Sequence, residues 1–356
     1  MMKKAIIFPY TADAITLFEN RDDSLIHIDS VLCFKEDLRS VSQKVEGITF
    51  DMPTFEKRGI DSIIICDNLL NNPLSAFQKV IFDGVKHGLS IQITPYLYTQ
   101  LQQFGLLDPV PPQSNISTIS LEEFCLDEPL PKLYSINVPV IAVMGLTPNS
   151  SKFDVQVELR KTFSDAGYKA TVIASNSLGK LLGMHVYPEF MFSDHSLAKK
   201  TYGFNHYVNK LVKDERPDVI IIGIPDGIIP YNQKVHNSFG EITSIVCHAV
   251  HPDFSILTSG FLDVVNQDYF SQLKLLCRYR FDTEIFAFCI SNNKIQENDT
   301  GDGYNTYFLS NEFAESLPGF GKENIDNVFY NADHIGRKKV FQKLVEVLES
   351  NINPIC

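Results

Sequence analysis

Metal-binding and redox cysteine pairs are missing from this sequence. Its seven cysteines are an odd number, and no two of them are spaced as in a CxxC motif. Cys66 and Cys289 lie in the apolar runs "SIIIC" and "IFAFCI", where a cysteine behaves as a small buried apolar residue. We therefore expect no zinc or iron–sulfur site built from these cysteines alone.

The sequence also lacks a long apolar run and an excess of positive charge. No run approaches the roughly 20 apolar residues that span a bilayer. The start, "MMKKAIIFPYTADA", has two lysines, but the apolar run after them ends at Pro9, short of the roughly 7 residues in a signal peptide. The 31 basic and 43 acidic residues give a formal net charge of −12, so nothing offsets repulsion by nucleic-acid phosphates. These absences predict a cytoplasmic protein that binds neither nucleic acid nor a membrane.

Strand-like and helix-like segments alternate through the first hundred residues. The 44% apolar and 21% charged residues are an ordinary globular balance, and 356 residues suffice for two domains with a core each. Strands are expected at 4–10, 27–34, 61–67 and 89–98, and helices at 11–20, with Thr11 as N-cap, and at 73–88. This alternation predicts a small Rossmann-like domain over residues 1–106. It has no GxGxxG motif, so nothing local indicates a dinucleotide.

Residues 107–138 have a different composition. Prolines stand at positions 109, 111, 112, 129 and 131, among serines, asparagines and acids. Proline fixes φ and removes an amide donor, so the segment is not expected to join the centre of a sheet. The sequence predicts a proline-rich linker here, with one short helix at 120–125.

Strand-like and helix-like segments alternate again after the linker. Strands are expected at 140–145, 169–175, 217–225, 254–260 and 284–291, and helices at 153–167, 197–215, 267–280 and 336–350. The strands are nearly continuous apolar runs, which is typical of a parallel sheet covered by helices on both faces. The predicted fold class is α/β, with two Rossmann-like layered domains, the second over residues 139–356.

The stretch "VIAVMGLTPNSSKFDVQVELRKTF" (140–163) has the order of a phosphate-binding strand, loop and helix. In such loops glycines let backbone N–H groups turn toward an anion, and a lysine reaches the phosphates. Gly145 closes the strand and Lys152 opens the helix, but Ser151 replaces the glycine before the lysine and Phe153 replaces the metal-binding hydroxyl. The candidate phosphate-binding residues are Gly145, Thr147, Asn149, Ser150, Ser151 and Lys152. Three interpretations of this loop remain open: it hydrolyses a nucleotide, it binds a phosphate or nucleotide without turnover, or it only caps the helix and binds no ligand.

Further candidates follow the later strands. In nucleotide hydrolases an acid at the end of a neighbouring strand holds Mg²⁺. Here that strand ends in Gly223, with Asp226 three residues on, where "IPDG" is also an ordinary turn. Asp263 and Asn266 follow the strand at 254–260, at the edge where α/β ligands bind. We treat these three polar residues as possible ligand-facing groups.

One histidine pair has a spacing that could bind a metal. His248 and His251 are three residues apart with Asp253 nearby, but Pro252 disfavours the helix that would bring them together. Scattered surface histidines are the favoured interpretation, and no metal site is predicted.

The segment "PVIAVMGLTPNSSKFDVQVELRKTFSDAGYKATVIASNSLGKLLG" (139–183) resembles the P-loop-like peptide maturation system proteins of bacteria. These accompany radical-SAM maturases of cysteine-rich ribosomal peptides, and they read GTxxxxGKFTxQ at the loop, followed by a GY-K step. The sequence shares with them Gly145, Lys152, Phe153, Gln156, Gly167, Tyr168 and Lys169. It departs from them at Leu146, Ser151 and Asp154.

The resemblance implies a P-loop NTPase-like domain at 139–356 and a cytoplasmic accessory role in maturing a ribosomal peptide. The implied partners are a precursor peptide or a maturation enzyme, and the implied cofactor is ATP or GTP with Mg²⁺. The departures fall where nucleotide and metal would bind, so our hypothesis is a degenerate loop without efficient hydrolysis. One alternative is an active Mg²⁺-dependent ATP- or GTP-binding enzyme in which Thr147 or the serines replace the usual ligands. A second alternative is a metal or small-molecule enzyme that uses the interdomain cleft.

Overall fold

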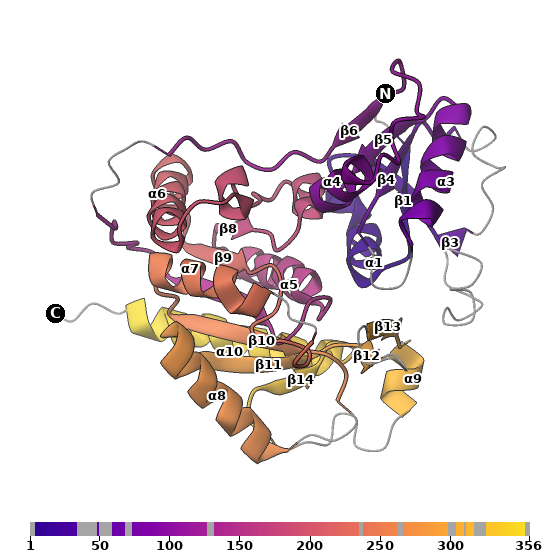
Figure 1. Ribbon diagram of the computed structural model, residues 1–356. Helices are drawn as coiled ribbons and strands as arrows, with labels where there is room; N and C mark the ends of the chain where they lie inside the picture. The colour runs from indigo at the N-terminus through magenta and orange to yellow at the C-terminus, as the bar shows by residue number, and fades with distance from the viewer. Residues whose placement is uncertain are drawn as a thin grey trace. The chain divides into compact units, whose positions relative to one another are not determined.

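The computed structural model describes most of the chain in two compact units. The described residues are 4–33, 48–49, 59–67, 73–126, 132–234, 238–262, 266–297, 304–309, 311–316 and 325–352. The first unit comprises residues 1–121 with 177–183 and 296–310, and the second comprises 122–176, 184–295 and 311–356. Each unit contains its own parallel sheet (Figure 1).

The first unit is a Rossmann-like sheet with helices. Its strands are β1 (Lys4–Phe8), β2 (His27–Leu32), β3 (Ile48–Thr49), β4 (Ser62–Ile65), β5 (Ser90–Ile93) and β6 (Ile116–Thr118), in the spatial order β3-β2-β1-β4-β5-β6. All the pairings are parallel, and this order is that of dinucleotide-binding Rossmann folds. The helices are α1 (Ala12–Glu19), α3 (Leu74–Lys86) and α4 (Pro95–Gln103), with a short 3₁₀ turn at Arg21–Asp23. The sequence prediction of a Rossmann-like α/β layer is confirmed.

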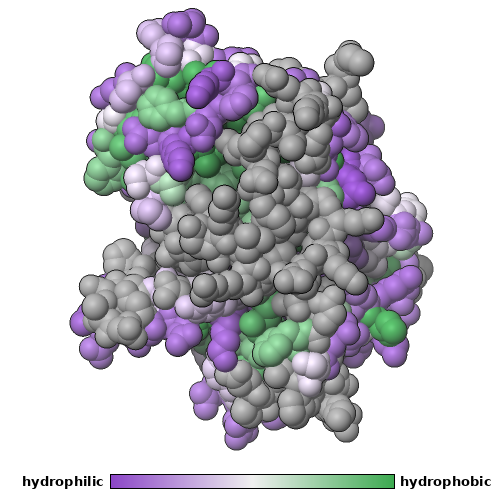
Figure 2. Space-filling view, turned by 90° about the vertical axis from the view of Figure 1, so that its right-hand side faces the viewer, coloured by the Kyte–Doolittle hydropathy of each residue, from purple (hydrophilic) through white to green (hydrophobic). Residues whose placement is uncertain are grey.

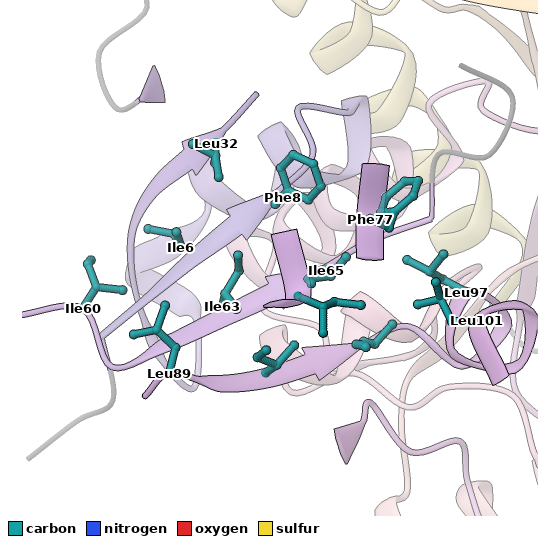
Figure 3. Packing of buried hydrophobic residues seen from close by; sticks show 13 residues of the cluster. Ile6, Phe8, Leu32, Ile60, Ile63, Ile65, Phe77, Leu89, Leu97 and Leu101 are labelled. Carbon is teal, nitrogen blue, oxygen red and sulfur yellow. The ribbon is translucent and has the colours of Figure 1, made fainter. Parts of the chain in front are cut away.

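One part of the core of this unit lies between the sheet and the helices α3 and α4. Figure 3 shows Phe8 of β1 and Ile65 of β4 on the side of the sheet that faces Phe77 of α3. The rings of Phe8 and Phe77 meet edge to face with centroids 5.9 Å apart. Leu97 and Leu101 of α4 are fully buried in the same cluster. This apolar layer fixes the sheet against α3 and α4.

Four local expectations for residues 1–126 can be compared with the structure. Thr11 caps α1, as predicted, because its Oγ1 accepts a hydrogen bond from the amide of Ala14 at 3.1 Å. The strand predicted at 89–98 is wrong beyond Ile93, because Pro95 begins α4, and proline suits the first position of a helix. The helix predicted at 120–125 is also wrong, because Glu122 instead forms a parallel bridge to Pro188. Part of the predicted linker forms β6, which lies at the edge of the sheet.

The second unit is a six-stranded parallel sheet. Its strands are β7 (Val140–Gly145), β8 (Ala170–Ile173), β9 (Val219–Gly223), β10 (Phe254–Ser259), β11 (Ile285–Ile290) and β14 (Val328–Tyr330), in the order β14-β11-β10-β7-β9-β8. Its main helices are α5 (Lys152–Asp165), α6 (Leu197–Glu215), α7 (Glu241–Val250), α8 (Gln267–Phe281) and α10 (His334–Ile352). Its smaller elements are α9 (Asn311–Ser316) and 3₁₀ turns at Glu189–Phe192 and Ser238–Gly240. The 3₁₀ turn at Ser177–Leu182 and the strand β13 (Tyr304–Phe308) belong by contact to the first unit. The strands β12 (Asn293–Glu297) and β13 form a two-stranded sheet of their own.

The helices of the second unit cover both faces of its sheet. Helices α5 and α10 pack against each other, and α5 packs on β7, β8 and β9 (Figure 1). Helices α6, α7 and α8 pack in a row, and α8 contacts β11. Right-handed crossovers place these two groups on opposite faces. The predicted parallel sheet with two helical layers is confirmed, and β7 lies between β10 and β9 with all six of its residues buried.

The surface is mixed in polarity. On the face drawn in Figure 2, hydrophilic residues lie among smaller hydrophobic areas. Within the described parts of the chain, every helix is too short or too polar to cross a membrane.

Candidate phosphate-binding site

The loop between β7 and α5 lies at the carboxyl edge of the second sheet. Backbone bonds fasten it on both sides: Leu146 N donates to Thr258 O at 2.8 Å, and Ile228 N donates to Gly145 O at 2.9 Å. The first bond comes from the end of β10 and the second from the segment that follows β9. The carboxyl ends of parallel strands are where α/β proteins bind their ligands. The fold therefore places residues 145–152 in the position of a ligand-binding loop.

Lys152 points back into this loop. It is the first residue of α5, it is only 7% exposed, and its Nζ donates to the carbonyl of Asp226 at 2.7 Å. The same Nζ lies 3.5 Å from Thr147 O and only 2.9 Å from where a Cβ on Gly145 would stand. A Cβ there would also meet Ser150 Oγ at 2.5 Å, so residue 145 must be glycine for the loop to close. The ammonium group therefore lies over Gly145, inside the loop.

The loop keeps a glycine-like backbone without glycines at these positions. Asn149 and Ser151 have φ angles of 55° and 62°, in the left-handed region that glycine adopts most easily. Asn149 also accepts a hydrogen bond from the side chain of Asn293, which fastens its carbonyl to the segment after β11. Two residues of the loop thus adopt a backbone conformation typical of glycine although neither is glycine.

Hydroxyl groups occupy the interior of the loop. Ser150 Oγ donates to Thr147 O at 2.9 Å and lies 2.7 Å from Thr258 Oγ1, which in turn donates to Met144 O at 3.1 Å. Thr147 Oγ1 differs from these, because it is buried and makes no hydrogen bond to the described residues. An unsatisfied buried hydroxyl costs about 1–3 kcal/mol. The Thr147 hydroxyl is therefore able to donate a hydrogen bond to a ligand.

The positions at which a nucleotide hydrolase holds Mg²⁺ are filled by other groups. Phe153 is buried, with 1% of its surface exposed. The adjacent strand β9 ends at Gly223, and a Cβ there would lie 2.0 Å from Nε2 of Gln156. Gln156 is fully buried, donates to Lys152 O and Ser175 Oγ at 2.9 Å each, and accepts from Ser175 N at 3.1 Å. An amide therefore takes the place next to β9 where a metal-binding acid is expected.

The acid in the first turn of α5 is also engaged. Asp154 Oδ2 accepts hydrogen bonds from Arg337 Nη1 at 2.8 Å and from Asn331 Nδ2 at 2.7 Å. Arg337 is 4% exposed, and its other nitrogen lies 3.7 Å from Glu158 Oε2. The Asp154 carboxylate is thus turned toward the start of α10. Its charge is compensated there, so it opposes a bound phosphate less than the sequence suggests.

The other predicted ligand-facing groups have different positions. Asp226 has a φ of 61°, and it is its backbone carbonyl that meets Lys152. Asn266 caps α8, accepting from Asp268 N at 2.8 Å. Asp263 lies outside the described residues.

The histidine pair and its acid do not converge. His248 Nδ1 donates to Ser244 O at 2.6 Å, and His251 terminates α7, as the following proline suggests. Asp253 Oδ2 accepts from Val140 N at 2.8 Å, which fastens the start of β7. In the part of the chain that the structure describes, no group of three or more histidine, cysteine, aspartate or glutamate residues could hold a metal ion.

Sequence reasoning missed the polar residues that line the loop from neighbouring strands. Thr258 comes from β10 and Asn293 follows β11, and both are less than 4% exposed. Their signal is a polar run placed directly after an apolar strand, as in "IFAFCISNN". Arg337 carried no such signal, because its partners are nearly two hundred residues away.

Comparison with known proteins supports the fold. Neither a protein-family model nor a curated sequence matches the chain. A DUF1611 family protein from Anabaena variabilis ATCC 29413 has a TM-score of 0.58 at 13% identity, over 97% of this chain and 100% of that chain. The two proteins share one fold. The sheet order and the loop at β7 also make the second unit P-loop NTPase-like.

Two further solved structures match more weakly. Cobyrinic acid a,c-diamide synthase from Mycobacterium smegmatis with bound ADP and magnesium has a TM-score of 0.36 at 14% identity, over 61% of this chain and 100% of that chain. The signal recognition particle receptor FtsY from Elizabethkingia anophelis has a TM-score of 0.29 at 18% identity, over 46% of this chain and 53% of that chain.

Proposed function

We propose that the second unit binds the phosphate groups of a nucleotide at residues 145–152 and hydrolyses the nucleotide slowly or not at all. In this proposal the protein is an accessory component in maturing a ribosomal peptide, and it binds the precursor peptide or a maturation enzyme. The observation that supports phosphate binding is the buried ammonium group of Lys152, which lies over Gly145 inside the loop between β7 and α5.

The electrostatics of the loop favour an anion. The Nζ of Lys152 donates to the carbonyl of Asp226 and lies 3.5 Å from the carbonyl of Thr147, which holds a positive charge at the loop. The start of α5 adds the equivalent of about half a positive charge from its unpaired N–H groups. A phosphate between Lys152 and the helix end would satisfy both, and Thr147 Oγ1 could donate to it.

Efficient hydrolysis needs more than this loop offers. Phosphoryl transfer depends on a metal ion and a positioned nucleophile to stabilise the charge of the transition state. Phe153 and Gly223 stand where the metal-binding hydroxyl and acid would be, and the amide of Gln156 fills the space beside Gly223. Binding without turnover is therefore the activity that the residues fit.

The accessory role rests on the resemblance of residues 139–183 to the peptide maturation system proteins. A formal net charge of −12 suits a basic partner segment. Its test is a titration of a cysteine-rich precursor peptide and of a radical-SAM maturase against the whole protein. Absence of binding to both the peptide and the maturase would remove this part of the proposal.

Calorimetric titration of ATP, GTP and ADP in the presence of Mg²⁺ tests the phosphate site. We expect Lys152→Ala to weaken binding at least about tenfold, or 1.4 kcal/mol, because it removes the ammonium group that faces the phosphate. Lys161→Ala is the matched control, because Lys161 is an exposed lysine on the same helix. Equal binding by the two variants, or steady release of inorganic phosphate by the wild-type protein, would contradict the proposal. Circular dichroism shows whether each variant is folded.

A further inference from the structure

A pocket of about 750 Å³ lies at the amino edge of the second sheet, where Val140 begins β7 and Phe254 begins β10. The phosphate-binding loop lies at the opposite, carboxyl edge. Ligand pockets usually have volumes of roughly 300–1,000 Å³. All the residues that line this one belong to the second unit. The pocket is therefore a candidate site of its own, formed within one unit.

One wall of the pocket has backbone groups that are open to pairing. This wall is the segment 133–139, which is neither helix nor strand and has mostly exposed residues. Tyr134 is fixed in place, because its N–H and C=O both bond to the side chain of Asn205, at 2.7 and 2.9 Å. The backbone groups of residues 135–137 make no hydrogen bond to any residue that the structure describes. Such a row of unpaired donors and acceptors can pair with a second extended chain.

The charged side chains that line the pocket are two acids and one histidine. The acids are Asp253 and Glu284, and the histidine, His251, has its Nδ1 3.8 Å from a further acid, Asp282. Glu284 is exposed, and its carboxylate forms neither a hydrogen bond nor an ion pair with the described residues. Helix α7 also ends at this pocket, and a helix C-terminus carries about half a negative charge. The pocket therefore favours a cationic group.

Apolar side chains supply much of the remaining lining. Ile136 comes from the open segment, Phe254 from β10 and Leu348 from α10. A cation also lies near the rim, because Lys213 Nζ is 5.1 Å from the ring centroid of Tyr134. Its contact with the ring keeps this ammonium group on the Tyr134 side, away from the Glu284 carboxylate. The lining thus combines an apolar surface with acids on one side.

We propose that this pocket binds an extended peptide segment that carries a lysine or arginine beside apolar residues; the inference rests on the proposed function, in which a precursor peptide is one partner. Residues 135–137 pair with the backbone of the peptide, as when a strand is added to a sheet. Glu284 and the end of α7 bind its basic side chain, and Ile136 and Leu348 contact its apolar side chains. The open backbone groups favour a peptide over a small cation, which offers no matching row of donors and acceptors.

The test selects peptides from a random heptapeptide library displayed on phage, with the whole protein as the target. Enriched peptides should carry a lysine or arginine beside apolar residues, and the most enriched peptide is synthesised and titrated by calorimetry. We expect Glu284→Lys to weaken its binding at least about fivefold, because like charges then face each other. Asp268→Lys is the matched control, since Asp268 is an exposed acid at the start of α8, at the other edge of the sheet, and should leave binding unchanged. Circular dichroism shows whether each variant is folded.

Amide hydrogen exchange of the wild-type protein locates the bound peptide and does not depend on either variant. The amides of residues 135–137 should exchange rapidly in the free protein and at least about tenfold more slowly in the complex. Slowed exchange at other residues only, or equal binding by the Glu284 and Asp268 variants, would overturn the inference and leave the proposed function intact. Failure to enrich any peptide would also overturn it, whereas the proposed function is tested separately by the nucleotide and precursor-peptide titrations.

Discussion

Single residues decide whether the loop keeps its shape. A non-glycine residue in the left-handed region costs roughly 1–2 kcal/mol, and Asn149 and Ser151 both adopt it. Such local strain persists where the surroundings fix it, and it is frequent at ligand sites. Here the surroundings are the bonds from Asn293 and Thr258 and the close fit at Gly145. The strained conformation is therefore maintained by residues from three strands.

Arg337 is the residue that ties the start of α5 to α10. Besides Asp154, its guanidinium contacts Glu158 and donates to His334 Nδ1 at 3.0 Å. We expect Arg337→Met to lower the free energy of unfolding by roughly 3 kcal/mol, because it leaves a partly buried carboxylate without its counter-ion. Urea unfolding followed by circular dichroism measures this change.

The matched control is Lys338→Met, which removes an exposed cation from the neighbouring position of α10. Exposed substitutions usually change stability by less than about 0.5 kcal/mol. If the Arg337 and Lys338 variants have equal free energies of unfolding, the buried ion pair between Arg337 and Asp154 does not stabilise the packing of α5.

At the scale of elements, the sequence predicted those helices and strands that show a clear apolar pattern within their own residues. Helices α5 and α6 and strands β7 and β9 lie where periodicity and apolar runs placed them. Helix α7 was not predicted: seven of its ten residues are buried, and its polar face is a narrow one made by Glu241, Ser244 and His248. The polar contacts of the loop could not be predicted either, because they join strands that are over a hundred residues apart. The position of the loop between β7 and α5 was predicted from the sequence, whereas the residues that contact it depend on the sheet order.

The end of α6 stabilises the edge strand β8 in a pH-dependent way. Glu215 accepts from Thr171 Oγ1 of β8 at 2.5 Å and also bonds to His185. Burial raises the pKa of Glu215, but the hydrogen bonds from Thr171 and His185 and the charges of His185 and Lys169 outweigh it, so the pKa lies below its ordinary value of 4.5. Stability from this carboxylate is therefore full above pH 4.5 and is lost as the pH falls through the lowered pKa.

We expect Glu215→Gln to be less stable than the wild type near neutral pH and to lose less stability on acidification. Urea unfolding at about pH 7 and about pH 3.5 measures both effects. Glu346→Gln, an exposed change on α10, should keep the wild-type pH dependence. A Glu215 variant with an unchanged pH profile would show that this group does not titrate differently on folding.

At the scale of the whole molecule, the chain does not divide at a single point. The sequence predicts boundaries at 106 and 138, but residues 177–183, between β8 and α6 of the second unit, belong by contact to the first. Leu181 is buried there, and its carbonyl accepts from Leu25 N at 2.8 Å and Ser24 Oγ at 3.1 Å. The 3₁₀ turn that contains it packs on α1. A segment that lies between two parts of the second unit in sequence thus completes the core of the first.

The division into two units predicts which strands exchange their amide hydrogens faster when a core residue is truncated. Leu181→Ala should remove about 2 kcal/mol or more from the first unit, since truncating a buried leucine leaves a cavity. Amide hydrogen exchange should then speed up in β1 and β2, although residue 181 lies between elements of the second unit in sequence. Leu159→Ala, in the buried face of α5, is the matched change and should speed up exchange in β7 and β9 instead. If Leu181→Ala accelerates exchange mainly in β7 and β9, then residues 177–183 stabilise the second unit, and the two cores are not divided as their contacts indicate.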